Sequence, residues 1–251
     1  MSVAPKFCRQ SDSGDPRRYR ERVKSPDLFK FQVTLKETDL LVSAEKDLTQ
    51  EALAIVWKYR NQIEKYIAQD PQFKESLVPR TVDALAPPIV REMAAAGREA
   101  GVGPMAAVAG AIAEFVGRDL LDQSPQIIVE NGGDIFLATK VKRKISIFTE
   151  KKSLPTYVDF WIDPKKTPLG ICTSSGTEGP SFSFGRADAV MVISSSAAIA
   201  DAMATAAGNM VHSRKDIHKV LDFLRGARQV KAGAVFVEGE MGFWGDLELA
   251  E

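Results

Sequence analysis

Histidine and cysteine are scarce in this chain of 251 residues, and neither sign of charge is in excess. Lysine plus arginine and aspartate plus glutamate number 33 each, so the formal net charge is zero. A protein that coats nucleic acid needs a basic excess to neutralise phosphates, and we therefore expect no nucleic-acid partner. The two histidines, His212 and His218, provide no paired-histidine metal spacing and no Ser-His-Asp arrangement.

Cys8 and Cys172 are too few for a disulfide framework, so we expect two free thiols in a reducing compartment. A nucleophilic role for Cys172 is disfavoured, because a thiolate needs a nearby base or cation and both histidines lie far along the chain. No apolar run is as long as a membrane span, and the first residues lack the apolar segment of a secretory signal. These absences predict a cytoplasmic protein without a membrane partner.

Hairpin and helix patterns succeed one another without a linker, which predicts one α+β domain with a mostly antiparallel sheet and packed helices. Residues 1–16 are predicted to be a disordered tail and residues 17–251 the domain. The expected strands lie in segments 29–45, 127–139, 144–150, 155–163, 187–194 and 232–250. The expected helices span 47–70, 86–101, 103–121, 195–211 and 213–227, and 71–88 is expected to be a connecting loop.

The predicted helix 47–70 is amphipathic, with Asp47 or Thr49 able to cap it. Apolar residues recur in it at helical spacing, which predicts that they pack on the core: Leu53, Val56, Trp57, Ile63 and Ile67.

Two further segments have a simple and a functional interpretation. The arginine-rich segment 17–24 is either a solvated arm or an anion-binding arm, in which Arg18 and Arg20 flank the ring of Tyr19. The helix 103–121 has one face of very small side chains, made by Ala106, Ala109, Gly110 and Ala113. Such a face allows tight packing on the sheet, or the close approach of another backbone or a flat ligand.

Residues 173–179, TSSGTEG, combine hydroxyls and glycines before a predicted buried strand. Glycine lets several backbone N–H groups converge on one anion. This segment predicts a phosphate cradle, although an ordinary surface turn has the same composition. No Gly-Lys-Ser/Thr follows, so it is not a Walker P-loop. The candidate ligand-binding residues are Thr173, Ser174, Ser175, Gly176 and Thr177.

Asp201 and Thr205 are four residues apart, so they share one helix face. A carboxylate and a hydroxyl suit Mg²⁺ or Ca²⁺, which take oxygen ligands. The alternative is structural, because aspartate is favoured in a first helical turn and threonine can bond its own i−4 carbonyl. The sequence Asn131-Gly132-Gly133-Asp134 is typical of a hairpin turn. It is also a place where a ring or phosphate could lie against the glycines, with Asp134 nearby.

Four of these segments resemble motifs of the ApbE family, the magnesium-dependent flavin transferases: VENGGDIFLA (129–138), IADAMATAAG (199–208), the small-residue helix 103–121 and ICTSSGTEG (171–179). A closer resemblance, over nearly the whole chain, is to a family of uncharacterised bacterial and archaeal proteins related in fold to ApbE. It rests on words such as KETDL (36–40), GVGPMAAVAG (101–110) and GICTSSGT (170–177).

The resemblance implies an ApbE-like fold, Mg²⁺ bound by Asp201 and Thr205 with help from a carbonyl of 106–109, and FAD or FMN near Gly132 and Gly133. Asp134 would be a base or a supporting group. The chain departs from the flavin transferases at Ala109, where they carry lysine, and at Pro180, near their histidine.

The predicted partner is therefore a small phosphorylated ligand, with flavin or nucleotidyl transfer as a further step. A non-catalytic binding module and an assembly subunit remain alternatives, and formation of a homo-oligomer stays open.

Overall fold

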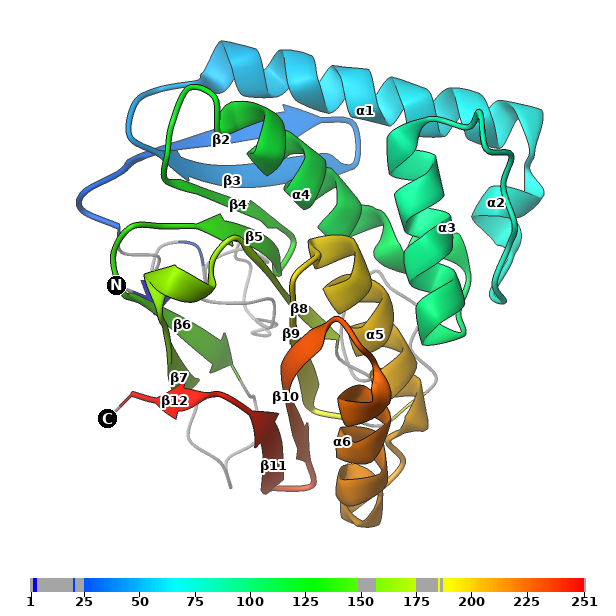
Figure 1. Ribbon diagram of the computed structural model, residues 1–251, viewed down its shortest axis with the longest axis vertical. Coiled ribbons are helices and arrows are strands. Elements are labelled where there is room, and N and C mark those ends of the chain that lie inside the picture. The colour runs from blue at the N-terminus through cyan, green and yellow to red at the C-terminus, as the bar shows by residue number, and fades with distance from the viewer. Residues whose placement is uncertain are drawn as a thin grey trace, which may run out of the picture.

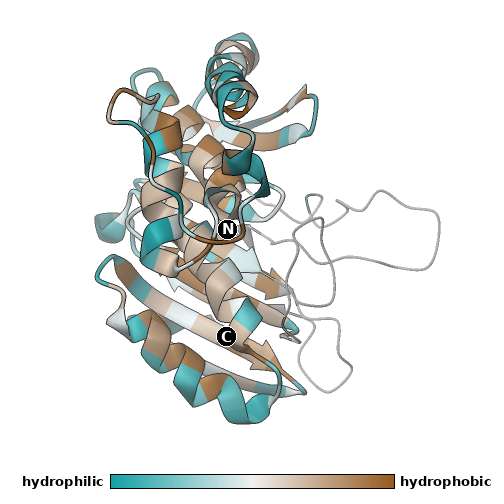
Figure 2. Ribbon diagram, turned by 90° about the vertical axis from the view of Figure 1, so that its right-hand side faces the viewer, coloured by the Kyte–Doolittle hydropathy of each residue, from teal (hydrophilic) through white to brown (hydrophobic). Residues whose placement is uncertain are grey.

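Helices cover one face of an eight-stranded sheet, and a four-stranded sheet covers its other face (Figure 1). This computed structural model describes residues 2–3, 20, 25–148, 157–174, 185 and 187–250. In Figure 2 hydrophobic residues dominate the strands, whereas hydrophilic residues colour much of the outer helices. The α+β class predicted from the sequence is confirmed.

The large sheet has the strand order β11-β10-β9-β8-β5-β4-β3-β2, and its neighbouring strands all pair antiparallel. Every predicted hairpin in it is present, because strand-forming residues lie on either side of short turns such as Gly132-Gly133. Its strands are β2 (Phe29–Leu35), β3 (Thr38–Ala44), β4 (Ile127–Asn131), β5 (Asp134–Ala138), β8 (Leu169–Ser174), β9 (Ala189–Ser194), β10 (Val230–Val237) and β11 (Glu240–Gly245).

The small sheet has the order β1-β6-β7-β12, made by β1 (Ser2–Val3), β6 (Arg143–Phe148), β7 (Tyr157–Ile162) and β12 (Glu248–Leu249). Strand β1 runs parallel to β6, and β12 runs antiparallel to β7. Apart from Ser2–Val3, the predicted disordered tail lies outside the described residues, so that part of the prediction stays a prediction.

The helices are α1 (Thr49–Gln69), α2 (Gln72–Glu75), α3 (Pro88–Ala100), α4 (Val108–Leu120), α5 (Ala197–Met210) and α6 (Ile217–Gly226), with 3₁₀ turns η2 (Pro104–Ala107), η3 (Pro164–Lys166) and η4 (Arg214–Asp216). Several elements differ from the sequence prediction. Strand β8 was not expected, because Thr173 and Ser174 belong to a segment with the composition of a loop, and the expected helix 213–227 begins as the 3₁₀ turn η4. The expected loop 71–88 contains α2, because Phe73 is fully buried and packs edge-on against Tyr66 with ring centroids 5.1 Å apart. The expected helix 103–121 begins as the 3₁₀ turn η2.

Two apolar cores lie on opposite sides of the large sheet. Val190 and Val192 of β9 face the helices, whereas Met191 and Ile193 face the small sheet. The unbroken apolar run at 189–193 is explained by this burial on both faces.

The predicted core face of helix α1 is confirmed in part: Val56, Ile63 and Ile67 pack on the core. Ala52, Val56, Tyr59 and Ile63 are buried, at the spacing of one helix face. Leu53 and Trp57, predicted to pack inward, are 37% and 60% exposed. The predicted cap is wrong in position, because the residue before α1 is Leu48, which makes no side-chain cap hydrogen bond. Asp47 Oδ1 does accept a hydrogen bond of 3.0 Å from the N–H of Thr49, the first residue of the helix.

Within the ranges that the structure describes, no single helix is both long enough and apolar enough to cross a membrane. The bent pair 88–100 and 104–120 meets the length and composition test together, with an angle of 106° between its halves.

Candidate functional site

The small-residue face of α4 lies against the backbone of α5. A Cβ on Gly110 would stand 2.1 Å from the Ala197 carbonyl oxygen and 2.8 Å from Asp201 Cβ, so only glycine fits at this position. The closeness brings the Gly110 N–H to Asp201 Oδ2 at 2.9 Å. The face predicted to permit close approach therefore receives another helix, and the contact orients the carboxylate of Asp201.

The turn between β4 and β5 is attached to the start of α4. Asn131 Nδ2 donates a hydrogen bond of 3.0 Å to the Ala109 carbonyl. Gly132 and Gly133 have φ of 62° and 103°, in the left-handed region that glycine adopts without strain. The hairpin interpretation of this motif is confirmed. Asn131 of the turn bonds Ala109, and the next residue, Gly110, bonds Asp201.

A buried carboxylate supports the turn from the opposite face of the sheet. Glu130 is 1% exposed, and its Oε1 accepts a hydrogen bond of 2.5 Å from the Gly133 N–H. Its Oε2 accepts from Arg20 Nε at 2.7 Å, and Arg20 also donates to Asp39 Oδ1 at 2.9 Å. The Arg20 guanidinium is thus held by two carboxylates of its own chain, instead of acting as the anion clamp considered from the sequence. Arg18 and Tyr19 lie outside the described residues.

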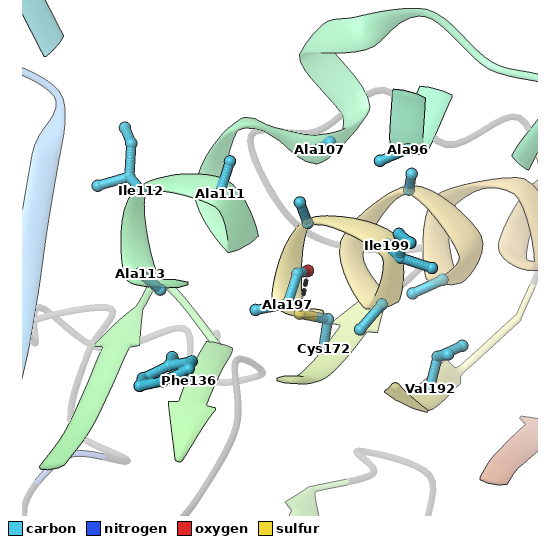
Figure 3. Packing of buried hydrophobic residues seen from close by; sticks show 14 of the residues in the cluster. Ala96, Ala107, Ala111, Ile112, Ala113, Phe136, Cys172, Val192, Ala197 and Ile199 are labelled. Carbon is cyan, nitrogen blue, oxygen red and sulfur yellow. Dashed lines mark hydrogen bonds between the residues drawn. The ribbon is translucent and has the colours of Figure 1, made fainter. Parts of the chain in front are cut away.

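Two aspartates lie near one buried thiol. The pairing of Ile135 with Ile171 places Asp134 across from Cys172 on the helix-facing side of the sheet. Cys172 is fully buried and its Sγ donates to the Ala197 carbonyl at 3.3 Å (Figure 3). Burial raises the pKa of this thiol, and the charges of Asp134 and Asp201 raise it further. The neutral, inaccessible thiol confirms that Cys172 is a poor nucleophile.

The candidate phosphate-binding hydroxyls are divided between the two faces of the sheet. Ser174 follows Cys172 by two residues and so faces the helices, whereas Thr173 alternates to the other side. The Thr173 hydroxyl is buried and has no hydrogen-bond partner among the described residues. Ser175, Gly176 and Thr177 lie outside the described residues, and their role remains a prediction.

Ser174 and Thr205 lie at similar distances along β8 and α5 from the point where the two elements touch. A Cβ on Gly170 would lie 2.2 Å from Ala197 Cα, which fixes the start of β8 against the start of α5. Four strand residues advance about 13 Å, and eight helical residues about 12 Å. Because Cys172 also lies near Asp201, strand and helix run in the same direction. Thr205 is half-buried, as is Asp201.

Glu114 lies beside the start of α5, near the candidate site, and the sequence motifs did not predict it. This α4 carboxylate is 4% exposed and caps α5, since its Oε2 accepts from Ser196 Oγ at 2.8 Å and from the Ala197 N–H at 2.6 Å. Its other oxygen accepts from Arg118 Nε at 2.9 Å. A sequence signal exists, because Glu114 follows Gly110 by four residues and is the charged member of an otherwise small-residue face.

A second carboxylate lies beside Glu114. Burial raises the pKa of Glu92, and the negative charge of Glu114 adds to this effect. Ser196 Oγ donates to Glu92 Oε1 at 3.4 Å as well as to Glu114. Two acidic side chains of the same chain, Glu92 and Glu114, therefore lie at the start of α5.

No three histidine, cysteine, aspartate or glutamate side chains gather as a metal site in the part of the chain that the structure describes. Two surface hollows lie elsewhere. One, of 450 Å³, is lined by Leu35, Gln50, Leu53, Ala54 and Trp57. The other, of 380 Å³, lies between α6 and β11 and includes Arg214, Asp222, Arg225, Glu240 and Trp244.

Comparisons of sequence place the chain among known relatives. A family model described as AbpE bacteria matches residues 20–225. A UPF0280 protein of Methanocaldococcus jannaschii is 42% identical over 206 residues, which cover 81% of this chain and 84% of that protein. A UPF0280 protein of Methanocella arvoryzae is 36% identical over 219 residues, covering 87% and 88%.

Comparisons of structure confirm the predicted ApbE-like fold. The apo form of the flavinyl transferase ApbE of Pseudomonas stutzeri superposes with a TM-score of 0.58 and 14% identity, covering 86% of this chain and 93% of that one. The ApbE protein of Thermotoga maritima gives a TM-score of 0.51 and 14% identity, covering 89% and 97%. At this identity the likeness establishes the fold alone.

Proposed function

The chain belongs to the AbpE bacteria family, and from this membership we propose that it binds a flavin or another phosphorylated, nucleotide-like ligand together with a divalent cation. The observation that carries the proposal is the approach of Asp134 and Asp201, from different elements, to the same buried thiol of Cys172. Flavin is the first candidate because solved proteins of this fold are flavin transferases by name.

The residues present fit a hard cation. Asp201 contributes a carboxylate that is oriented by the Gly110 N–H, and Thr205 contributes a hydroxyl from the next turn of α5. Mg²⁺ is commonly bound through one or two carboxylates, while waters and a ligand phosphate complete its shell. When bound, the cation would neutralise charge on the ligand's phosphates. Asp201 and Thr205 would hold it, and Asp134 would be either a proton acceptor or a support for the bound water.

The phosphate would lie along the helix-facing side of β8. Ser174 is the described hydroxyl of the 173–177 segment that faces this side, at the level of Thr205. The flat ring would lie toward Gly132, where a glycine at φ 62° leaves the backbone uncovered by a side chain. Ser175, Gly176 and Thr177 would complete the phosphate contacts.

Calorimetric titration tests the binding proposal. FMN, FAD and ATP are each titrated with and without Mg²⁺ into the wild type, Asp201→Asn and Asp222→Asn, the last being an exposed aspartate of α6. We expect at least one ligand to bind more tightly with Mg²⁺, and Asp201→Asn alone to lose that gain. Absence of binding for all three ligands, or an equal Mg²⁺ effect in Asp201→Asn, would contradict the proposal.

Catalysis is a second candidate, favoured by the shared fold with flavin transferases. Mass spectrometry of FAD incubated with the protein and divalent cations would detect AMP release, the product of cleaving the pyrophosphate. Binding without AMP release would identify a non-catalytic ligand-binding module. Loss of the lysine at Ala109 and of the histidine near Pro180 would then account for the missing chemistry.

A further inference from the structure

The outer side of α1 and the adjoining strand β2 form an exposed, mostly apolar surface, here named the α1–β2 face. Leu35, Gln50, Leu53, Ala54 and Trp57 line one hollow of this face, and Phe29 is the exposed first residue of β2, on the same side of the strand as Leu35. Phe29 is 61% exposed and Trp57 is 60% exposed. Burying an aromatic side chain removes roughly 150–250 Å² from water, so these two leave on the order of 250 Å² of ring surface exposed. With Leu53 and Leu35 added, the face falls in the size range that often marks interaction sites.

Helix α1 has a second apolar stripe that its own fold does not use. Gln50, Leu53, Ala54 and Trp57 follow the spacing i, i+3, i+4, i+7, and so share one side of the helix. This side points away from the buried stripe that packs on the core. The outer stripe is uncharged, whereas a solvated helix face normally carries charged residues.

We propose that the α1–β2 face is the interface of a homodimer, in which two copies of α1 pack antiparallel about a two-fold axis near Ala54. Such an interface is isologous, so the same surface must complement itself. The charges beside the stripe meet this requirement. Glu51 and Lys58 are seven residues apart and therefore lie on the same flank. In an antiparallel two-fold pair like flanks meet, which sets Glu51 near the partner's Lys58. The Lys58 ammonium also donates to Asp119 Oδ2 of its own chain at 3.0 Å, so Glu51 would be its second acceptor.

Other occupants fit less well. The second surface hollow is lined by Arg214, Asp222, Arg225 and Glu240, so it does not match an uncharged stripe in a head-to-tail assembly. The α4 face, whose small residues could have formed an apolar assembly surface, is largely covered by the fold: Gly110 and Ala113 are buried, and Ala106 and Ala109 are half-buried.

Strand β2 lies beside α1 and extends the same interface. It is the last strand in the order of the large sheet among the described residues. With a two-fold axis near Ala54, residues 49–59 of α1 overlap the same residues of the partner's α1 over about 16 Å. The rest of a standard interface of roughly 800 Å² per partner would come from β2 and from the second half of α1.

Sedimentation velocity of the full-length chain tests the proposal. We expect the wild type to have twice the chain mass of 27.4 kDa and Trp57→Glu to sediment as a folded monomer. The matched control is Leu85→Glu, which places the same charge on a leucine that is 94% exposed outside the face. It should remain dimeric. Glu51→Lys should weaken the dimer, more so at low salt, because it opposes the partner's Lys58.

Three results would overturn the proposal: a monomeric wild type at every concentration, a dimeric Trp57→Glu, or equal dissociation by Leu85→Glu. If the wild type is monomeric and a soluble quencher fails to reach Trp57, a segment of the same chain covers the face and the proposal is equally wrong. Circular dichroism of each variant establishes that a monomer is folded. The outcome is independent of ligand binding.

Discussion

Two regions differ in what covers their surfaces. The small-residue face of α4 is covered by α5, whereas the outer side of α1 is exposed to solvent. At Gly110 two backbones touch, and Asp201 receives an N–H from the facing helix. On α1, Leu53 and Trp57 present large apolar side chains to water. Small residues and paired polar groups form a region that the chain completes by itself. Large exposed apolar groups form the surface that we propose is covered by a second copy of the chain.

Breaking the buried ion pair behind the β4–β5 turn should have the largest effect on the self-completed region. Arg20→Met leaves the carboxylate of Glu130 buried without its cation, and loss of one partner of such a pair costs about 3–5 kcal/mol. Arg214→Met is the control, since Arg214 and Glu240 are mostly exposed and their pair contributes less than about 1 kcal/mol. Urea unfolding measures both. A similar loss in the free energy of unfolding for Arg20→Met and Arg214→Met would contradict the prediction.

Gly110→Ala should destabilise the protein by about 3 kcal/mol, because the new methyl group meets a backbone carbonyl that cannot turn aside. The same substitution at Gly226, where nothing lies within 4 Å, should be neutral or slightly stabilising. Thermal unfolding of the two variants separates crowding from backbone entropy. An unchanged melting temperature for Gly110→Ala would show that the helices separate easily.

Glu114→Gln should lower the free energy of unfolding by about 2 kcal/mol, since hydrogen bonds to a charged group are worth about 1.5–3 kcal/mol and the amide retains only part of them. The donors affected are Ser196 Oγ and the first N–H groups of α5. Glu99→Gln, an exposed carboxylate of α3, serves as control. Equal effects of the two substitutions in chemical denaturation would exclude a capping role for Glu114.

The smallest effect concerns Glu92 and depends on pH. Burial and the charge of Glu114 raise the pKa of Glu92 in the folded protein above its unfolded value. Ionised Glu92 therefore costs stability above the folded pKa, and this cost disappears as the pH falls to the unfolded pKa. Glu92→Gln should be more stable than the wild type at pH 7, with a gain that shrinks on acidification. A gain that is independent of pH would exclude this cause.

The elements that local sequence determines were predictable. The turn sequence Asn131-Gly132-Gly133 between two apolar strand segments predicted the β4–β5 hairpin, and Pro88 and Gly101 bracketed α3. The orientation of α1 about its own axis was not predictable from the sequence. The helix has apolar stripes on two sides, and spacing alone does not select the stripe that faces the core.

Sequence motifs did not predict which residues far apart in the chain contact each other at the site. Arg20 and Glu130 are 110 residues apart, and Gly110 and Asp201 are 91 residues apart. The sequence indicated that Gly110 permits close approach and that Asp201 has a functional carboxylate, but the fold alone brings them together. Glu114 was missed for the same reason, since its hydrogen-bond partners on α5 are 82 to 84 residues away.

The cap on α5 has a consequence for where an anion can settle. The N-terminus of a helix carries a partial positive charge and commonly attracts phosphate. In this protein the carboxylate of Glu114 already occupies that position, with Glu92 beside it. An incoming phosphate would meet negative charge there, so the first turn of α5 repels the group that such helix ends usually hold. The positive end of the α5 dipole is therefore matched by carboxylates of the same chain, and the phosphorylated ligand that we propose would be repelled from this helix end.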